Sequence, residues 1–154
     1  MSDSSNSNGW RDAFETIVSR VAAPMWVVTA VDESGPAGCL VGFTTQVSID
    51  PPRFLVGLSR ANHTFGVVQR VRHLAIHTVP ATAGDVAAHF GGRSGDDEDK
   101  FAAVAWHVGP HGTALIHALP DWFVGEIIER FDFGDHEGVL LAPVAAHASE
   151  LEVT

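Results

Sequence analysis

Residues 41–64 read VGFTTQVSIDPPRFLVGLSRANHT, and this stretch predicts more about the fold than any other. Neutral hydrogen-bonding side chains crowd its first half. Pro51 and Pro52 then interrupt it, because proline lacks an amide donor and keeps the preceding residue out of a helix. The apolar run 53–58 follows, and we expect it to form a strand. A second polar cluster, residues 59–64, ends the stretch, so the predicted strand has neutral polar groups on both sides.

Short apolar segments separated by turn residues flank this stretch. Apolar side chains at helical spacing predict an amphipathic helix over residues 10–22, and residues 25–31 and 38–43 read as strands joined by a Gly-Pro turn. Further strands are expected at 74–79, near Trp106, and at 114–118, 122–129 and 139–146, with short helices from Asn62 to about Arg70, from Thr82 towards Phe90 and at the acidic run 96–99. About six or seven antiparallel strands with a few short helices predict a mainly β fold, either a barrel or a sandwich.

Length and composition are those of one domain. The chain has 154 residues, of which 45% are hydrophobic. We expect residues 1–9 to be a disordered leader, residues 10–148 to form the domain and residues 149–154 to be an acidic tail. No apolar run reaches the length of a membrane span, and the leader lacks the pattern of a secretion signal. The single cysteine, Cys39, excludes an internal disulfide and fits a cytoplasmic location.

Charge is distributed unevenly along the chain. The net charge of −10 argues against nucleic acid and anionic membranes as partners. From Arg53 to Arg93, however, five arginines stand against one acidic residue, Asp85. Such a positive island predicts one compact anionic ligand, and purely structural arginines are the alternative.

Motifs for several common sites are absent. No GxGxxG follows a predicted strand, and neither GxxxxGK[ST] nor GxSxG occurs, so we expect no conventional nucleotide cradle and no nucleophile elbow. Nine histidines occur without HExxH spacing, and with one cysteine in the chain they predict no metal site.

Three segments resemble the flavin reductase family, whose members are FMN-binding split-barrel proteins that reduce flavin with NAD(P)H. The first is GFTTQVSIDPPRFLVGL followed by SRANHT, residues 42–64, which contains the family's Ser-x-Asp-Pro-Pro pattern. The others are HFGGRSGDDEDKF, residues 89–101, and FGDHEGVLLAPV, residues 133–144. The resemblance covers about residues 10–147. It implies a split β-barrel that binds FMN or FAD, uses NADH or NADPH and forms a homodimer.

The resemblance also implies where the cofactor lies. An isoalloxazine ring needs apolar faces and neutral donors and acceptors along one edge, which amides and hydroxyls supply without the cost of burying a charge. The segment expected along the ring is Phe43, Thr44, Thr45, Gln46, Val47 and Ser48, with Thr45 and Gln46 near flavin N5 and O4. The segment expected to hold the phosphate comprises Ser59, Arg60, Asn62, His63 and Thr64. Phe90 is expected either to cover part of the ring or to seal the core.

Asn62 and His136 each have a plainer alternative. Asn62 is a good N-cap, and the first free amides of the helix that it caps suit an anion, but capping alone would also explain Asn62 and Thr64. By resemblance, His136 is the catalytic residue, which positions the nicotinamide substrate or helps to protonate the flavin, since imidazole exchanges protons near neutral pH. Its alternative is an exposed residue of a Gly-rich turn.

The function implied by the resemblance is NAD(P)H-dependent reduction of flavin, with hydride passing from nicotinamide to flavin N5. Reduced flavin would then either diffuse to a partner monooxygenase or pass its electrons onward. Two alternatives stay open at this point. One is a flavin-binding or electron-carrier module without reductase turnover, and the other is a split barrel for another cofactor, such as a deazaflavin or pyridoxal phosphate.

Overall fold

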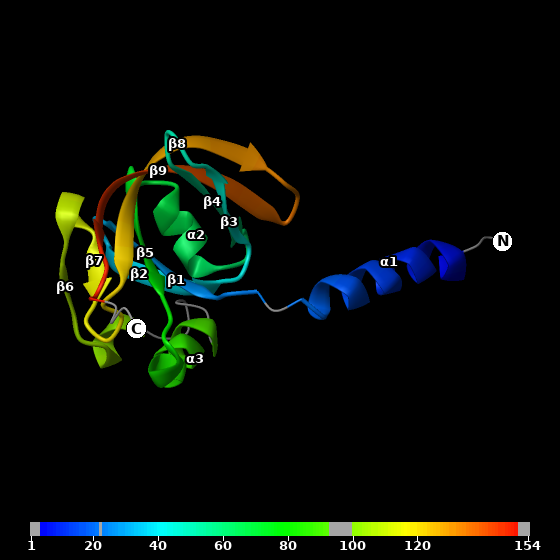
Figure 1. The fold of residues 1–154 in the computed structure, drawn as a ribbon, viewed down its shortest axis with the longest axis horizontal. Helices are drawn as coiled ribbons and strands as arrows, with labels where there is room; N and C mark the ends of the chain where they lie inside the picture. The colour runs from blue at the N-terminus through cyan, green and yellow to red at the C-terminus, as the bar shows by residue number, and fades with distance from the viewer. Residues whose placement is uncertain (1–3, 22, 93–99, 151–154) are drawn as a thin grey trace.

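An antiparallel sheet of seven strands organises the chain (Figure 1). The computed structural model describes residues 4–21, 23–92 and 100–150. In chain order the elements are α1 (Ser4–Ser19), β1 (Trp26–Asp32), β2 (Gly35–Val41), β3 (Thr44–Ser48), β4 (Arg53–Ser59), α2 (His63–Val68), β5 (His73–Thr78), η1 (Ala81–Ala83), α3 (Gly84–Gly92), η2 (Lys100–Ala103), β6 (Trp106–Val108), η3 (Pro110–Gly112), β7 (Ala114–Ile116), β8 (Trp122–Asp132) and β9 (His136–His147). The strand order in the sheet is β2-β1-β5-β8-β9-β4-β3, and β6 and β7 form a separate pair.

Three hairpins, β1–β2, β3–β4 and β8–β9, supply most of this sheet. Gly35 has a φ of 119° in the first turn and Gly134 a φ of 121° in the third, and residues with a side chain rarely adopt such angles. The β3–β4 turn contains Pro51 and Pro52, as the sequence predicted, and the Asp50–Pro51 peptide bond is cis. Local turn chemistry therefore accounts for the pairing within these three hairpins.

The sheet curls around α2 (Figure 1), and α3 packs against β2. Successive side chains of a strand point to opposite faces, so neighbouring residues of β1 enter different cores. Val28 packs in the larger cluster with Val67 and Val68 of α2, whereas Val27 packs in a second cluster with Phe90 of α3. The prediction of a mainly β fold is confirmed, and the curled antiparallel sheet fits a split barrel.

A buried histidine ties the β6–β7 pair to the large sheet. His77 of β5 is fully buried, its Nδ1 donates to the Val27 carbonyl at 3.0 Å, and its Nε2 accepts from the Ile116 amide at 3.1 Å. Only the neutral ring can serve both partners. Burial lowers the pKa of His77 to about 4, which keeps the ring neutral at physiological pH.

Helix α1 and strand β3 differ from what the sequence predicted. Helix α1 begins at Ser4, so residues 4–9, expected to belong to a disordered leader, lie in the helix. Residues 44–48 form strand β3, which the sequence did not predict as a strand. β3 lies at an edge of the sheet and its central residues are exposed, so apolar alternation is not required of it. The acidic run 96–99 lies outside the described residues.

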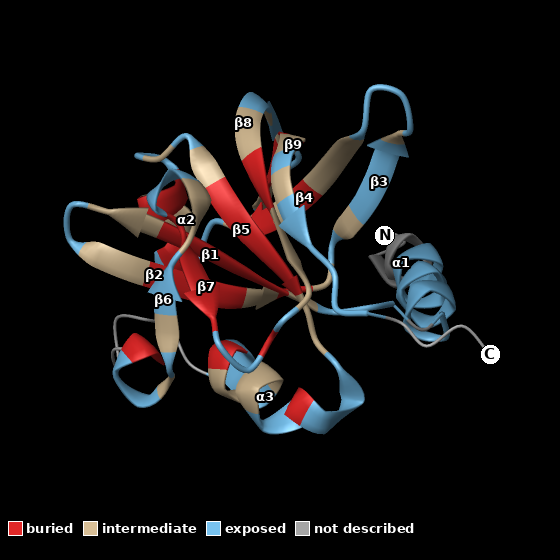
Figure 2. Ribbon diagram, turned by 60° about the vertical axis from the view of Figure 1, so that its left-hand side comes forward, coloured by how far each residue is buried: buried red, intermediate tan, exposed pale blue. Residues whose placement is uncertain are grey.

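Helix α1 projects from the sheet (Figure 1), and Figure 2 colours its described residues as exposed, so its apolar face is uncovered. The side chains that share this face are each more than half exposed: Trp10, Phe14, Ile17, Val18 and Val21. No helix in the described part of the chain combines the length and the hydropathy needed to cross a membrane. The face therefore requires a different explanation, and its C-terminal end borders the candidate site.

Candidate functional site

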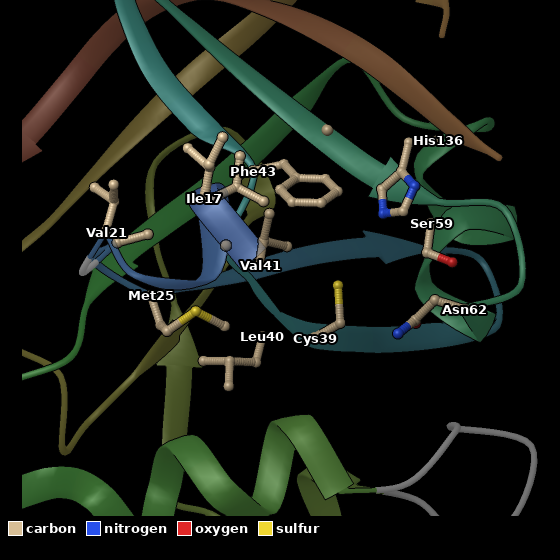
Figure 3. A pocket seen from close by; sticks show the side chains of 14 residues that line it. Ile17, Val21, Met25, Cys39, Leu40, Val41, Phe43, Ser59, Asn62 and His136 are labelled. Carbon is tan, nitrogen blue, oxygen red and sulfur yellow. The ribbon is translucent and has the colours of Figure 1, made fainter. Parts of the chain in front are cut away.

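A groove of about 730 Å³ lies where the end of α1 faces the sheet (Figure 3). Apolar side chains line one end of the groove: Ile17, Val21 and Met25. Polar side chains line the other end: Ser59, Asn62 and His136. Strand β2 runs between the two ends (Figure 3). Apolar walls with a few convergent polar groups are typical of sites for small molecules and cofactors.

A second hollow of about 400 Å³ adjoins this groove. Both hollows are lined by Phe43, Gly57 and His136, and the second adds the threonine pair Thr44 and Thr45. Phe43 is 65% exposed. Its aromatic ring thus offers open apolar surface at the boundary of two hollows, next to neutral hydroxyl groups.

His136 is the first residue of β9, and its imidazole borders both hollows. The His136 Nδ1 lies 2.8 Å from Asp135 Oδ1. This hydrogen bond and the adjacent imidazole hold the pKa of Asp135 below its usual value. An ionised carboxylate can only accept, so the His136 Nδ1 carries the hydrogen. In the neutral ring, Nε2 then has the free lone pair and can take up a proton.

The turn that carries His136 is held by Arg60. The Arg60 Nε donates to the Gly134 carbonyl at 2.9 Å, and its Nη2 donates to Asp132 Oδ1 at 2.9 Å. The Arg60 backbone amide donates to the Asp135 carbonyl at 3.0 Å. Its guanidinium therefore faces the turn, and Arg60 is not among the described residues that line either hollow.

Asn62 caps α2, as the sequence predicted. Its Oδ1 accepts from the Thr64 amide at 2.9 Å, and its side chain also lines the groove (Figure 3). Thr64 and Cys39 are both buried. Burial raises the pKa of Cys39 to about 11, so this thiol is protonated at neutral pH and is a poor nucleophile.

The structure gathers about half of the predicted site residues around the two hollows. The residues brought together are Phe43, Thr44, Thr45, Ser59, Asn62 and His136. Gln46, Val47 and Ser48 lie on β3 but line neither hollow, and the Gln46 Nε2 donates to the Ser48 carbonyl at 3.1 Å. These three residues come after Thr44 and Thr45 in the same edge strand, beyond the part of it that lines the second hollow.

Two further predicted residues also lie outside the hollows. Phe90 is 1% exposed, and its ring centroid lies 5.5 Å from that of Phe101 in an edge-to-face contact. Of the two roles expected for Phe90, the structure supports sealing the core. His63 is the exposed first residue of α2 and is not among the described lining residues.

Two features of the site were missed from the sequence. The wall formed by residues 17–21 was predicted as an apolar helix face, but nothing in the sequence says which surface that face meets. The second is buried Glu137, whose Oε1 accepts from Gln69 Nε2 at 2.8 Å and from Arg130 Nη1 at 3.1 Å. These bonds join the end of α2 to the β8–β9 hairpin directly beside His136. No local sequence motif predicts them.

Three of the histidines, His73, His77 and His111, have structural partners. Among the described residues, no group of three or more His, Cys, Asp or Glu side chains is placed to hold a metal ion. His73 stacks on His111 with ring centroids 4.0 Å apart, and His77 bridges the two sheets.

Known proteins match most of this chain. The family model described as Flavin reductase like domain matches residues 18–153. FMN reductase (NADH) RutF of Methylorubrum extorquens is 33% identical over 138 residues, which are 89% of this chain and 66% of that protein. Stachydrine N-demethylase reductase subunit Stc3 of Rhizobium meliloti is 34% identical over 113 residues, 71% of this chain and 48% of the relative. The chain thus spans from about half to two thirds of the length of these curated relatives.

Solved structures share the fold. The flavin reductase domain protein of Arthrobacter sp. FB24 superposes with a TM-score of 0.82 at 21% identity, over 91% of this chain and 86% of that one. The NADH:FAD oxidoreductase of Streptomyces globisporus C-1027, solved with NAD and FAD fragments, gives a TM-score of 0.72 at 25% identity, over 80% of this chain and 73% of that one. Because the family model covers most of the sequence and the fold agrees, this chain belongs to the Flavin reductase like domain family.

Proposed function

We propose that this chain catalyses the NADH-dependent reduction of FMN or FAD. The observation that supports this most is the groove in which Phe43 and His136 lie beside the polar side chains of Ser59 and Asn62. The names of relatives point the same way, since one is an FMN reductase (NADH) and another was solved with NAD and FAD fragments. We prefer NADH to NADPH as the reductant because these names specify NADH or NAD.

The residues present fit a flavin. The groove volume of about 730 Å³ is in the range of small-molecule sites, roughly 300–1,000 Å³. Phe43 offers an exposed aromatic ring for stacking, and Thr44 and Thr45 supply hydroxyls for a polar ring edge. The described residues that line the groove include no carboxylate, so a phosphate beside Ser59 and Asn62 would meet no like charge there.

The chain's own residues bind, orient and shield in this proposal. When bound, flavin supplies the redox chemistry by taking a hydride from reduced nicotinamide. Once a flavin packs against Phe43 and the apolar wall from α1, these side chains shield that part of the ring from water. Asp135 fixes the tautomer and orientation of His136, whose Nε2 then positions the second substrate or takes up a proton.

Two protein partners complete the proposal. A second copy of the chain covers the apolar face of α1, because an isolated helix of this length is marginal in water without tertiary packing.

A monooxygenase consumes the reduced flavin. The reductase component of 4-nitrophenol 4-monooxygenase/4-nitrocatechol 2-monooxygenase of Rhodococcus opacus is 27% identical to this chain over 135 residues. A cytoplasmic location suits the single reduced thiol, Cys39.

Steady-state oxidation of NADH with added FMN or FAD tests the function, with NADPH as the comparison. We expect NADH consumption that depends on the flavin. Visible absorbance and mass spectrometry of any ligand released on denaturation identify the natural cofactor. A protein that binds flavin but turns over neither nucleotide would be a carrier, and release of a deazaflavin or pyridoxal phosphate would overturn the choice of cofactor.

A further inference from the structure

The side chain of Arg60 faces away from the groove that the preceding residue lines. Ser59 borders the groove, whereas Arg60 directs its Nε and Nη2 to Gly134 and Asp132. Asp132 Oδ1 also accepts from the Gly134 amide at 3.1 Å. The guanidinium and the backbone of the turn therefore meet at one carboxylate oxygen, which fixes the shape of the turn.

Arg60 also sits where strand pairing with β9 ends. Ser59 is the register partner of His136, and the next amide, that of Arg60, donates to the Asp135 carbonyl at 3.0 Å. On its other side, the Arg60 guanidinium carbon lies 5.5 Å from the centroid of the Phe65 ring in α2. One side chain thus contacts both α2 and the turn that precedes His136.

We propose that Arg60 is a positioning residue, which holds the 132–135 turn and thereby His136 at the groove, rather than a ligand of the cofactor's phosphate. This inference rests on the proposed function, in which His136 acts on the second substrate. Arginine suits the role because its planar fork reaches two acceptors in fixed directions, whereas lysine offers a point charge on a flexible stem.

The charges agree with this geometry. The Gly134 amide and the Arg60 guanidinium hold the pKa of Asp132 below its usual value, so the pair is ionised at neutral pH. The Arg60 and Asp132 side chains are 38% and 80% exposed. Exposed ion pairs contribute little to folding stability. Variants at these positions can therefore lose the geometry of the turn while keeping the fold.

The test compares Arg60→Met, Arg60→Lys and Asp132→Ala with a matched control, Arg72→Met. Like Arg60, Arg72 pairs with a carboxylate of β8 and lines neither hollow, but its partner is Glu126, at 3.5 Å, which does not belong to the 132–135 turn. Three quantities are measured on the full chain. They are amide hydrogen exchange over 132–136 without added ligand, the affinities for FMN and for riboflavin by fluorescence, and the rate of NADH-dependent flavin reduction.

We expect all three test variants, including Arg60→Lys, to exchange faster over the turn and to reduce flavin about 10- to 100-fold more slowly, because small misplacements of a catalytic group are costly. FMN and riboflavin affinities should each change by less than about threefold, and the control should match the wild type. A selective loss of FMN over riboflavin affinity in Arg60→Met would make Arg60 a phosphate ligand and overturn the proposal. Tighter FMN binding by Asp132→Ala, which frees the cation, would overturn it in the same way.

Two further outcomes would also count against Arg60 as a positioning residue. Wild-type behaviour of Arg60→Lys would show that charge alone is needed, and faster exchange with an unchanged rate would show that the turn does not position His136. If the wild type reduces no flavin, the proposed function fails and the positioning of a catalytic residue fails with it. Exchange and the comparison of FMN with riboflavin would still decide whether Arg60 holds the turn or a phosphate.

Discussion

The rings of Phe43 and His136 lie against each other at the boundary of the two hollows, with centroids 4.8 Å apart and planes inclined by 50°. Strand β4 brings them together. The Gly57 amide donates to the Phe43 carbonyl at 2.7 Å, and Ser59 pairs with His136 across the sheet. A Cβ at Gly57 would lie 3.1 Å from the Cβ of Phe43, so glycine permits the close approach of this ring to β4.

The substitution His136→Ala should slow flavin reduction by NADH about 100-fold, the scale of a lost acid–base group, while flavin affinity stays nearly intact. The reason is that Phe43, Ser59 and Asn62 still line the groove. Single-turnover reduction and flavin fluorescence measure the two quantities, and His107→Ala, at an exposed position in β6, is the control. An equal loss of rate and affinity would show that the imidazole holds the flavin rather than acting on the second substrate.

Much of the fold is predictable because local chemistry determines it. The proline pair marks the β3–β4 turn, Asn62 caps α2, and alternating or continuous apolar runs mark β1, β4 and β5. β3 escaped prediction because an exposed edge strand needs no apolar face. The start of α1 escaped because polar residues precede the apolar stripe that identifies the helix.

The substitution Asn62→Asp separates capping from phosphate binding. Aspartate also caps helices well, so folding stability should be kept, whereas Asn62→Ala should lose about 0.5–2 kcal/mol. The new charge lines the groove and should weaken FMN binding about 10-fold or more. Riboflavin, which lacks the phosphate, should bind both the wild type and Asn62→Asp equally well. Equal effects on both flavins, or a stability loss in Asn62→Ala with unchanged flavin affinity, would leave Asn62 as a plain cap.

The site was predictable only where contacts are local in sequence. Phe43, Thr44, Thr45, Ser59 and Asn62 belong to one continuous stretch of sequence, and the pairing of β3 with β4 brings them to the two adjoining hollows. The contacts of the Arg60 side chain were not predictable, because its acceptors belong to a hairpin far along the chain and are reached only through the β4–β9 register. The contacts of Glu137 were unpredictable for the same reason, because its partners lie at the end of α2 and in β8.

His77 should make folding stability depend on pH. Burial lowers its pKa from 6.5 to about 4, so between these values the unfolded chain binds a proton that the native state does not. Stability should therefore fall as the pH drops through this window, by about 3 kcal/mol in total. Urea unfolding at neutral pH and at about pH 4.5 measures the change. In His77→Gln the dependence should be smaller, while exposed His117→Gln should behave as the wild type. A His77→Gln variant with the wild-type slope would contradict this account.

The apolar face of α1 should be the contact with a second copy of the chain. Phe14 is 57% exposed in the middle of this face, and burying such a side chain stabilises by about 1.5–3 kcal/mol. Phe14→Asp should therefore weaken the dimer about 10- to 100-fold or more, and Thr16→Asp should not, because two positions along a helix place the same charge on the opposite face.

Light scattering over a concentration series gives the oligomeric state. A monomeric wild type would exclude the second copy, and a Phe14→Asp dimer as stable as the wild type would place the interface elsewhere. Because the end of α1 also forms a wall of the groove, loss of flavin affinity in the same variant would show that dimer and site depend on one helix.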